Sequence, residues 1–380
     1  MLLYLSYIRR CLPRSDCFLL FYAGVNDRKV DLFEGQYPVP NGISYNSYII
    51  KGEKVAVMDS VDKNFGEEWL ENIEKVLGDK APDYLVVLHM EPDHSANIKA
   101  FLEKYPDAVV VSSAKAFAMM ENYFGKEIAK NRLEVKDGEK LDLGGRSLTF
   151  VAAPMVHWPE VIVAYESSEK LLFSADAFGK FGAFDVKADW ACEARRYYFN
   201  IVGKYGGPVQ TLLGKLKGQD IRSIRPLHGP ILEENLGEYL SLYDTWSKYE
   251  PETEGVFIAA ASIHGGTLKA AEKLAEMLRE KGVGKVVVSD LCRSDIAENV
   301  EDAFRYSSMI VAASSYDGGL FTPMYDFLHR LQIKGYTKRN VGILENGSWA
   351  PCAGRIMKEM LSQMKEINIV EPMVTIRSQQ

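Results

Sequence analysis

The stretch His89-Met90-Glu91-Pro92-Asp93-His94 decides the fold, because it places four metal-type side chains directly after residues 84–88, an apolar run that predicts a buried strand. Such side chains stand on a loop at the carboxyl end of a strand, where α/β folds usually put their sites. His157, Asp176 and His228 follow farther along the chain. Donors of these types, arriving in this order from separate loops, are typical of a two-metal site, with Asp176 as the candidate bridge between ions roughly 3.5–4 Å apart. The pattern indicates a redox enzyme.

The composition fits two globular domains in a reducing compartment. The chain has 380 residues, 47% of them hydrophobic, enough for two cores of ordinary size. The net charge is −7, and basic and acidic residues are interspersed, so the sequence has no basic patch of the kind that binds nucleic acid. The five cysteines form no Cys-x-x-Cys pair, which argues against disulfides and cysteine-bound metals and favours the cytoplasm. The apolar run at the start of the chain is short, and its arginines follow it, whereas a signal peptide has its positive charges before the apolar run. No later run reaches the roughly 18 apolar residues of a membrane-spanning helix.

Two blocks of alternating strands and helices follow from the hydrophobic pattern. In the first block, β-branched runs predict strands at residues 47–50, 55–59, 84–88, 108–111 and 148–151. The helical spacing of apolar residues over 67–77 predicts a helix that covers this sheet. Proline, charge and glycine interrupt both patterns at residues 249–255, which predicts a boundary between a domain of residues 1–250 and a domain of residues 251–380.

The second block alternates strictly between the two kinds of element. The predicted strands are residues 256–261, 285–289, 309–313 and 340–344, and the predicted helices are residues 267–281, 296–306 and 324–332. Such alternation predicts a parallel, doubly wound sheet with helices on both faces.

The motif H-x-E-x-D-H, together with the three later ligand-type residues, resembles that of the flavodiiron proteins, also called A-type flavoproteins. The resemblance covers the whole chain, and its first 250 residues resemble the metallo-β-lactamase fold, an αββα sandwich. Hydrolases of that fold usually carry H-x-H-x-D-H and bind zinc, so Glu91 is the discriminating residue. A carboxylate in place of an imidazole makes the site harder and more anionic, which suits iron. By the resemblance, one iron binds His89, Glu91 and His157, the other binds Asp93, His94 and His228, and Asp176 bridges the two.

Three loops at predicted strand ends indicate a flavin site in the second domain. Residues 262–267 follow a strand and open a helix, so their N–H groups and hydroxyls can hold a phosphate. Residues 314–320 and 345–350 follow the third and fourth predicted strands of this domain, and a flavodoxin-like domain uses such loops to bracket the flavin ring of FMN. The lack of a G-x-G-x-x-G fingerprint favours FMN over a nicotinamide. The candidate FMN-binding residues are Ser262, His264, Gly265, Gly266, Thr267, Ser314, Tyr316, Asp317, Gly318, Gly319, Asn346, Gly347, Ser348 and Trp349. Tyr316 and Trp349 are the stacking candidates, with packing inside their loops as the alternative.

The resemblance implies an electron path from FMN to a di-iron centre that reduces O2 to water or NO to N2O. It also implies a head-to-tail homodimer that brings the flavin of one chain to the iron of its neighbour. The chain carries no rubredoxin or flavin reductase extension, so we expect a separate donor, a rubredoxin or a reduced deazaflavin. Two rival functions are a dinuclear zinc hydrolase with an appended flavodoxin domain, and an electron carrier that binds FMN but no metal.

Four further features complete the expectations from the sequence. Trp158 and Tyr198 are the candidate catalytic residues, through the nearness of Trp158 to His157 and through the resemblance, with core packing as the alternative. Glu34 stands where many family members have a histidine. Residues 1 to about 15 have no counterpart in the family. The chain stops at residues 374–380, just after a last strand that follows the predicted strand 340–344, where a flavodoxin-like domain normally adds a closing helix, so we expect uncovered apolar sheet surface there.

Overall fold

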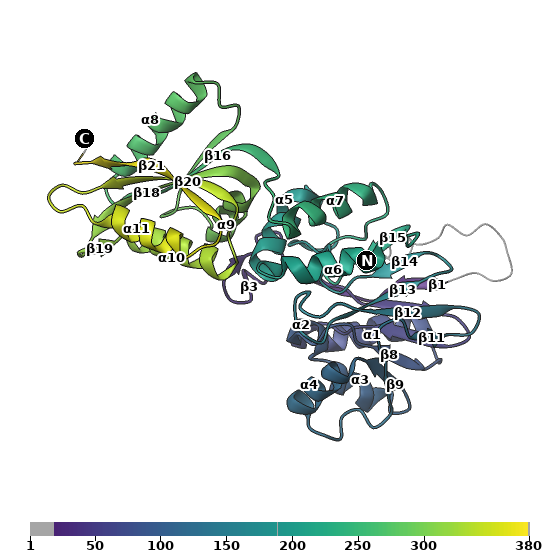
Figure 1. Cartoon of the computed structure of the whole chain (residues 1–380). Coiled ribbons are helices and arrows are strands. Elements are labelled where there is room, and N and C mark those ends of the chain that lie inside the picture. Colours follow the sequence, from purple (N-terminus) through teal and green to yellow (C-terminus); the bar gives the residue numbers. More distant parts are fainter. Residues whose placement is uncertain (1–18, 188, 379–380) are drawn as a thin grey trace. The chain divides into compact units, whose positions relative to one another are not determined.

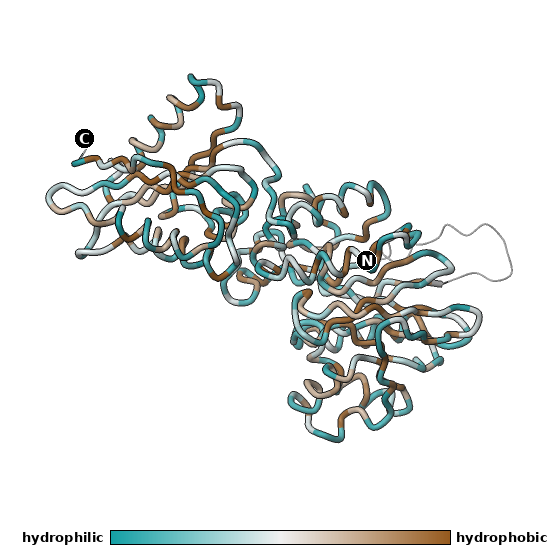
Figure 2. Tube along the Cα trace, viewed as in Figure 1, coloured by the Kyte–Doolittle hydropathy of each residue, from teal (hydrophilic) through white to brown (hydrophobic). Residues whose placement is uncertain are grey.

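The computed structural model describes residues 19–187 and 189–378, which form two compact units (Figure 1). The first unit contains the described residues up to Ala194 together with Pro208–Leu240, and the second contains Arg195–Gly207 together with the described residues from Ser241 onward. Apolar segments run along the strands inside both units (Figure 2). Residues 1 to about 15, which have no expected counterpart, lie outside the described part of the chain. The division into domains at residue 250 stays a prediction.

The first unit is a sandwich of two sheets, as the resemblance implies. The order of the first sheet is β1 (Leu19–Tyr22), β6 (Tyr48–Lys51), β7 (Val55–Met58), β8 (Tyr84–Val86), β9 (Val109–Ser112) and β10 (Arg132–Glu134). The order of the second sheet is β11 (Lys140–Asp142), β12 (Ser147–Ala152), β13 (Ile162–Glu166), β14 (Leu171–Phe173) and β15 (Ser223–Arg225). Helices α3 (Ile98–Lys104) and α4 (Ala114–Phe124) lie outside the first sheet, and α6 (Gly206–Leu216) lies outside the second (Figure 1).

Shorter elements complete this part of the chain. Two small sheets pair β2 (Val25–Asp27) with β5 (Ile43–Tyr45) and β3 (Leu32–Phe33) with β4 (Tyr37–Pro38). The remaining helical pieces are η1 (Lys63–Phe65), α1 (Gly66–Leu77), α2 (Pro92–Ser95), α5 (Trp190–Tyr197), the π-helix η2 (Tyr198–Val202) and α7 (Leu236–Ser247).

Helix α1 illustrates how the sequence produces these layers. Trp69, Ile73 and Leu77 recur every four residues and are buried, which confirms the helical period read from the sequence. The Trp69 indole N–H donates a hydrogen bond to Ser47 Oγ at 2.9 Å, so its polar atom is satisfied inside the unit. Burying Ile73 and Leu77 contributes roughly 1.5–3 kcal/mol each.

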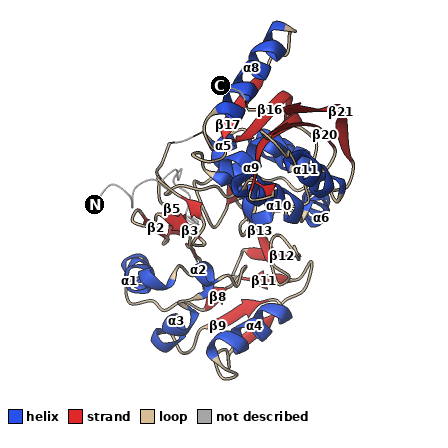
Figure 3. Cartoon of the chain, turned by 90° about the vertical axis from the view of Figure 1, so that its left-hand side faces the viewer, coloured by secondary structure: helices blue, strands red, loops and turns tan. Residues whose placement is uncertain are grey.

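The second unit is built around a parallel sheet of the order expected for a flavodoxin-like fold. Its strands are β17 (Val286–Asp290), β16 (Thr253–Ala261), β18 (Tyr306–Tyr316), β20 (Arg339–Asn346) and β21 (Ile367–Ile376), in that spatial order and all parallel. The short strand β19 (Gly319–Leu320) pairs with β18. Helix α8 (Gly266–Glu280) covers one face, and α9 (Ile296–Arg305), α10 (Thr322–Ile333) and α11 (Ala353–Ser362) cover the other (Figures 1 and 3).

The segment Arg195–Gly207 packs within the second unit. The Arg196 guanidinium donates to Asp295 Oδ2 from Nε at 3.1 Å and from Nη2 at 2.8 Å. The Phe199 ring stacks on Phe304 with centroids 4.2 Å apart, and Asn200 Nδ2 donates to the Ala297 carbonyl at 3.1 Å. These contacts are all made with α9 or its N-cap residue Asp295, so a stretch from the end of α5 to the first residues of α6 becomes part of the flavodoxin-like unit.

Two further observations concern helices. Among the described residues, no helix combines the length and the apolarity needed to cross a membrane. Within the described residues that follow β21, up to residue 378, there is also no helix. Val370 and Val374 on β21 are nearly half exposed, at 47% and 48%.

Candidate functional site

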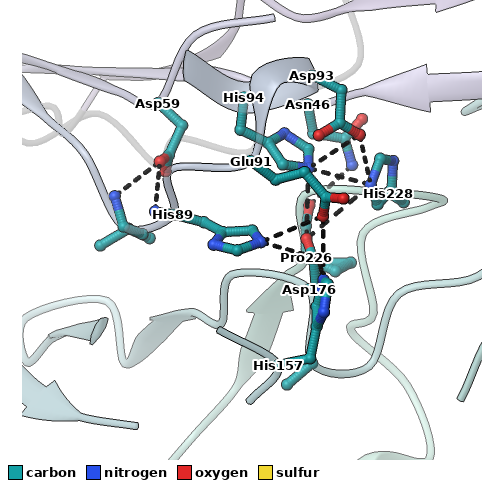
Figure 4. A network of polar contacts seen from close by, with 12 residues as sticks. Asn46, Asp59, His89, Glu91, Asp93, His94, His157, Asp176, Pro226 and His228 are labelled. Carbon is teal, nitrogen blue, oxygen red and sulfur yellow. Dashed lines mark hydrogen bonds and ion pairs between the residues drawn. The ribbon is translucent and has the colours of Figure 1, made fainter. Parts of the chain in front are cut away.

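The seven ligand-type residues predicted from the sequence come together in the first unit (Figure 4). His89 and Glu91 lie on the loop after β8, and Asp93 and His94 lie on the short helix α2 that continues it. The remaining three, His157, Asp176 and His228, stand on the loops that follow β12, β14 and β15. All seven are buried except Glu91, which is partly buried. Loops at the carboxyl ends of strands from both sheets therefore build one site.

The first group consists of His89, Glu91, His157 and Asp176. His157 Nε2 lies 3.0 Å from Glu91 Oε2 and 3.1 Å from Asp176 Oδ2. His89 Nε2 lies 3.4 Å from the same Glu91 oxygen and 3.5 Å from the same Asp176 oxygen. Two donors about 2.1 Å from a common ion and about 90–110° apart are separated by roughly 3.0–3.4 Å. The spacing therefore fits one metal ion.

The second group consists of Asp93, His94 and His228. His94 Nε2 lies 3.0 Å from His228 Nε2, and Asp93 Oδ2 lies 3.3 Å from the His228 nitrogen and 3.5 Å from the His94 nitrogen. Asp176 Oδ1 lies 3.3 Å from His94 Nε2, whereas Asp176 Oδ2 belongs to the first group. Asp176 thus offers one oxygen to each group, as a carboxylate that bridges two ions must.

The inward-facing atoms have the chemistry of metal ligands. Within the described part of the chain, His89 Nε2, both Asp93 oxygens and Asp176 Oδ1 are buried atoms without a hydrogen-bond partner. Leaving such polar atoms unsatisfied costs free energy, and a cation at each group would remove that cost. His228 Nδ1 donates to the Ser44 carbonyl at 2.8 Å, which leaves the Nε2 lone pair for a metal. Imidazole and carboxylate donors together suit iron.

The electrostatics of the two groups are strongly coupled. Burial opposes the protonated form of His157, but hydrogen bonds to Asp176 and Glu91 outweigh it and raise the pKa of His157 to about 9. Burial likewise opposes ionisation of Asp176, yet His89 and His157 hold the pKa of Asp176 well below its ordinary value. Without metal, protons on the imidazoles therefore balance the carboxylates. Because a metal ion must displace those protons, metal binding should strengthen as pH rises.

The three candidate flavin loops meet at the carboxyl ends of β16, β18 and β20. Thr267 Oγ1 lies 2.8 Å from Ser314 Oγ and accepts from Asn346 Nδ2 at 3.3 Å, so one residue from each loop joins the same hydrogen-bonded cluster. Helix α8 begins after Gly265, which has φ of 86° and makes no side-chain cap. The first N–H groups of α8 are therefore available to an anion.

Further features of these loops fit FMN. Ser262 Oγ is a buried atom that makes no hydrogen bond within the described residues, and a phosphate oxygen would satisfy it. Tyr316 is 46% exposed and Trp349 is 88% exposed, so both rings are accessible for stacking. Asp317 and Gly318 form the turn between β18 and β19, both with positive φ. His264 is exposed on the loop before α8, Gly266 is the first residue of α8, Gly319 lies in β19, and Gly347 and Ser348 lie on the loop after β20.

Known proteins match the chain over both units. Residues 43–229 match the family described as "ODP family beta lactamase". The nitric oxide reductase of Moorella thermoacetica is 30% identical over 94% of this chain and 92% of that protein. This chain belongs to the flavodiiron family. A mutant of the flavo di-iron protein from Thermotoga maritima has a TM-score of 0.86 at 26% identity, and the rubredoxin oxygen:oxidoreductase of Desulfovibrio gigas has a TM-score of 0.87 at 25% identity. Each alignment covers 94% of this chain and 91% of the other.

Membership in the flavodiiron family confirms the predicted fold class, a metallo-β-lactamase-like sandwich followed by a flavodoxin-like domain. It also confirms an oxidoreductase with FMN and a di-iron centre, and it does not favour the zinc hydrolase. The chain spans 50% and 55% of the length of two cyanobacterial diflavin flavoproteins that it also matches.

The two candidate catalytic aromatics of this flavodiiron protein lie in different surroundings. The Trp158 ring contacts the imidazoles of His89 and His157 edge-on, with centroids 5.4 Å and 6.1 Å apart. Tyr198 lies in η2 and packs against Tyr243 and Trp246 in the second unit, at 5.1 Å and 5.5 Å. Burial raises the pKa of the Tyr198 hydroxyl well above its ordinary value. Trp158 thus lies beside the first group, and the catalytic role of either residue stays a prediction.

Glu34 lies on the turn between β3 and β4 and faces the first group. Although the Glu34 side chain is exposed to solvent, the protein atoms around its carboxyl and the negative charge of Glu91 raise the pKa of Glu34 to about 7. The ring of the neighbouring Phe33 contacts His228 edge-on at 5.4 Å, and the Tyr45 ring contacts the same imidazole at 5.9 Å. Two aromatic side chains therefore border the second group, and the sequence alone gave no sign of them.

Two buried carboxylates behind the site were not predicted from the sequence. Asp59 Oδ1 accepts from the backbone N–H of Leu88 at 2.7 Å and of His89 at 3.3 Å, and burial raises its pKa to about 7. Glu160 Oε1 lies 2.8 Å from His89 Nδ1. Asp59 directly follows β7, and its place at a strand end could have identified it. Glu160 lies in an irregular loop, where no pattern distinguishes a buried carboxylate from an exposed one.

Proposed function

We propose that this flavodiiron protein passes electrons from FMN to a di-iron centre that reduces O2 to water, NO to N2O, or both. The observation that carries the proposal is the position of Asp176, whose two oxygens face two separate groups of donors 3.1 Å and 3.3 Å away. When bound, the flavin supplies electrons and the iron pair supplies the site at which a diatomic gas is reduced. The activities for which the Moorella and Desulfovibrio relatives are named, nitric oxide reductase and rubredoxin oxygen:oxidoreductase, support both gases.

The chain's own residues would hold the irons in two positions. His89, Glu91 and His157 would bind the first ion, Asp93, His94 and His228 would bind the second, and Asp176 would contact both. Three of the seven ligands are carboxylates, which lower the positive charge of a buried cation pair. Each ion would have four protein donors when Asp176 is counted for both, which leaves coordination positions open to a small molecule.

The flavin loops would orient FMN by its phosphate and its ring. The hydroxyls of Ser262 and Thr267 and the first N–H groups of α8 would hold the phosphate. The exposed rings of Tyr316 and Trp349 would pack on the isoalloxazine ring and shield it from water. Asn346 would fix the loops around it through its bond to Thr267.

The remaining parts of the proposal concern partners. A separate protein, such as a rubredoxin, would deliver the electrons, as the name of the Desulfovibrio relative indicates for that protein. A head-to-tail homodimer in the cytoplasm would be the working unit, because it would place the flavin of one chain beside the iron of the other.

Elemental analysis of anaerobically purified protein, with FMN measured in the same sample, tests the proposal. We expect about two irons and one FMN per chain, and in His157→Ala we expect less iron with unchanged FMN. Zinc in place of iron would instead support the hydrolase, and FMN without metal would support the electron carrier. Either result would overturn the proposal. Turnover rates with O2 and with NO, measured with a reduced rubredoxin as donor, then show which of the two gases the protein reduces.

A further inference from the structure

The imidazoles of the two metal positions are backed by different groups. At the first position, His89 Nδ1 lies 2.8 Å from Glu160 Oε1, and Glu160 has a fully buried side chain. At the second position, His228 Nδ1 donates to the neutral carbonyl of Ser44 at 2.8 Å. His94 Nδ1 is a buried atom without a hydrogen-bond partner in the described part of the chain. Of these three described imidazoles, that of His89 at the first position is therefore the one backed by a negative charge.

The direct ligand charges of the two positions are equal, so the difference lies in the residues behind the ligands. The first position has Glu91 as its own carboxylate and the second has Asp93, while Asp176 is shared. Glu160 adds a further carboxylate behind the first position alone. A carboxylate that accepts the Nδ1–H of a ligand imidazole fixes the tautomer with Nε2 toward the metal and makes that nitrogen a stronger donor.

Glu160 also orders the loop that carries two of the ligands. The same Oε1 accepts the backbone N–H of Met90 at 2.8 Å, and Met90 stands between His89 and Glu91 in the sequence. One oxygen thus fixes the imidazole of one ligand and the backbone next to the other. The Glu160 carbonyl in turn accepts from Ser113 Oγ at 2.9 Å, which holds its loop against the start of α4.

We propose that Glu160 makes the two metal positions unequal, so that the position of His89, Glu91 and His157 binds Fe(II) first and more tightly. Glu160 is a positioning residue in this scheme, since it acts through His89 and does not touch the metal. The inference rests on the proposed di-iron function and adds an order of loading to it. The position of Asp93, His94 and His228 fills second.

Stepwise loading of the metal-free full chain with ⁵⁷Fe(II), followed by Mössbauer spectroscopy, tests this order. His228→Ala, which retains every donor of the first position, gives a reference spectrum for iron in that position. His157→Ala gives the reference for the second position in the same way. At one equivalent of iron, we expect the unsubstituted protein to show the quadrupole doublet of the His228→Ala reference. A doublet that matches the His157→Ala reference would overturn the order.

Two substitutions at Glu160 and one matched control assign the cause. Glu160→Gln keeps an acceptor oxygen without the charge, and we expect about tenfold weaker Fe(II) binding at the first position. Glu160→Ala removes the acceptor as well, and we expect a loss of about 100-fold, the upper end for residues behind a ligand. Glu166→Gln is the control, because Glu166 is also buried and accepts the backbone N–H groups of Ser168 at 3.0 Å and Glu169 at 2.7 Å. We expect this control to keep the order of loading.

The outcomes separate this inference from the proposed function. Two irons that bind in a single indistinguishable step would overturn the inequality and leave the di-iron function intact. The same holds if Glu160→Gln changes the ratio of the two affinities no more than Glu166→Gln does. A protein that takes up no iron would overturn the function and the inference together.

Discussion

Replacement of Asp176 by alanine should release both irons, because Asp176 is the one residue in the described part of the chain whose oxygens face both groups. Its Oδ2 lies 3.1 Å from His157 Nε2 and 3.5 Å from His89 Nε2, and its Oδ1 lies 3.3 Å from His94 Nε2. Asp176→Ala leaves three protein donors at each position and removes a shared negative charge. His228→Ala, by contrast, leaves the first position with all four of its donors.

The expected loss of affinity follows from the type of contact that is removed. Changes to residues behind a metal ligand cost about 10–100-fold in affinity. Loss of a direct ligand should exceed that range, so we expect at least about 100-fold weaker binding at each position, or about 2.8 kcal/mol per ion. His228→Ala should produce such a loss at the second position alone.

Iron retained after equilibration against a graded series of chelator concentrations measures these losses. Asp176→Ala should lose both irons together, at a chelator concentration at which His228→Ala still holds one. Asp176→Asn keeps the side-chain volume and one oxygen, so it separates loss of the bridge from creation of a cavity. We expect its iron affinity to fall between those of Asp176→Ala and His228→Ala. An Asp176→Ala protein that retains one iron with unchanged affinity would refute the bridging role.

Three further predictions concern the second unit. Arg196→Ala removes one partner of a buried ion pair with Asp295, whose side chain also caps α9 by accepting the Ala297 N–H at 2.9 Å. The substitution should lower the free energy of urea unfolding by about 3–5 kcal/mol. A loss below about 1 kcal/mol would contradict the anchoring of the segment Arg195–Gly207. Thr267→Val removes the hydroxyl that joins the three flavin loops and should weaken FMN binding roughly tenfold or more in a fluorescence titration, with iron content unchanged. Burial raises the pKa of Glu301 from 4.5 to about 8, so the folded protein keeps a proton that the unfolded chain releases, and stability should fall as pH rises through that window; Glu301→Gln should flatten the fall in melting temperature between pH 5 and pH 9.

The elements of the fold follow closely from the sequence wherever a local pattern produces them. The expected helix 267–281 corresponds to α8, Gly266–Glu280, because apolar groups such as Ala271 and Ala275 recur on its inner face. The expected strands 55–59 and 84–88 correspond to β7 and β8, which end before the polar residues of the site. Helix α11 was not among the expected elements. It begins just after Pro351 and carries Gly354 in its first turn, so its start has weak helix propensity.

The segment Arg195–Gly207 shows what a local pattern does not contain. Its place in the second unit depends on an ion pair of Arg196 across 99 positions of sequence and on one stacked pair of rings. Neither contact leaves a periodic trace, because the two partners are distant in the chain. The same limit explains why the seven metal ligands were predicted and Glu160 was not. The ligands form a recognisable order of residue types, whereas Glu160 is identified only when the fold brings it within 2.8 Å of His89.

Glu91 links the sequence motif to the redox chemistry. An imidazole in its place, as in the zinc hydrolases of this fold, would leave the first position with Asp176 as its only direct carboxylate. With Glu91 present, a second carboxylate oxygen lies 3.0 Å and 3.4 Å from the imidazoles of that position. Negative ligand charge favours the ferric over the ferrous ion, because oxidation raises the positive charge that the buried site must hold. Glu160 acts in the same direction through His89. A carboxylate within the motif and another behind it therefore both suit the first position to iron that changes its oxidation state, a demand that a hydrolytic zinc site does not face.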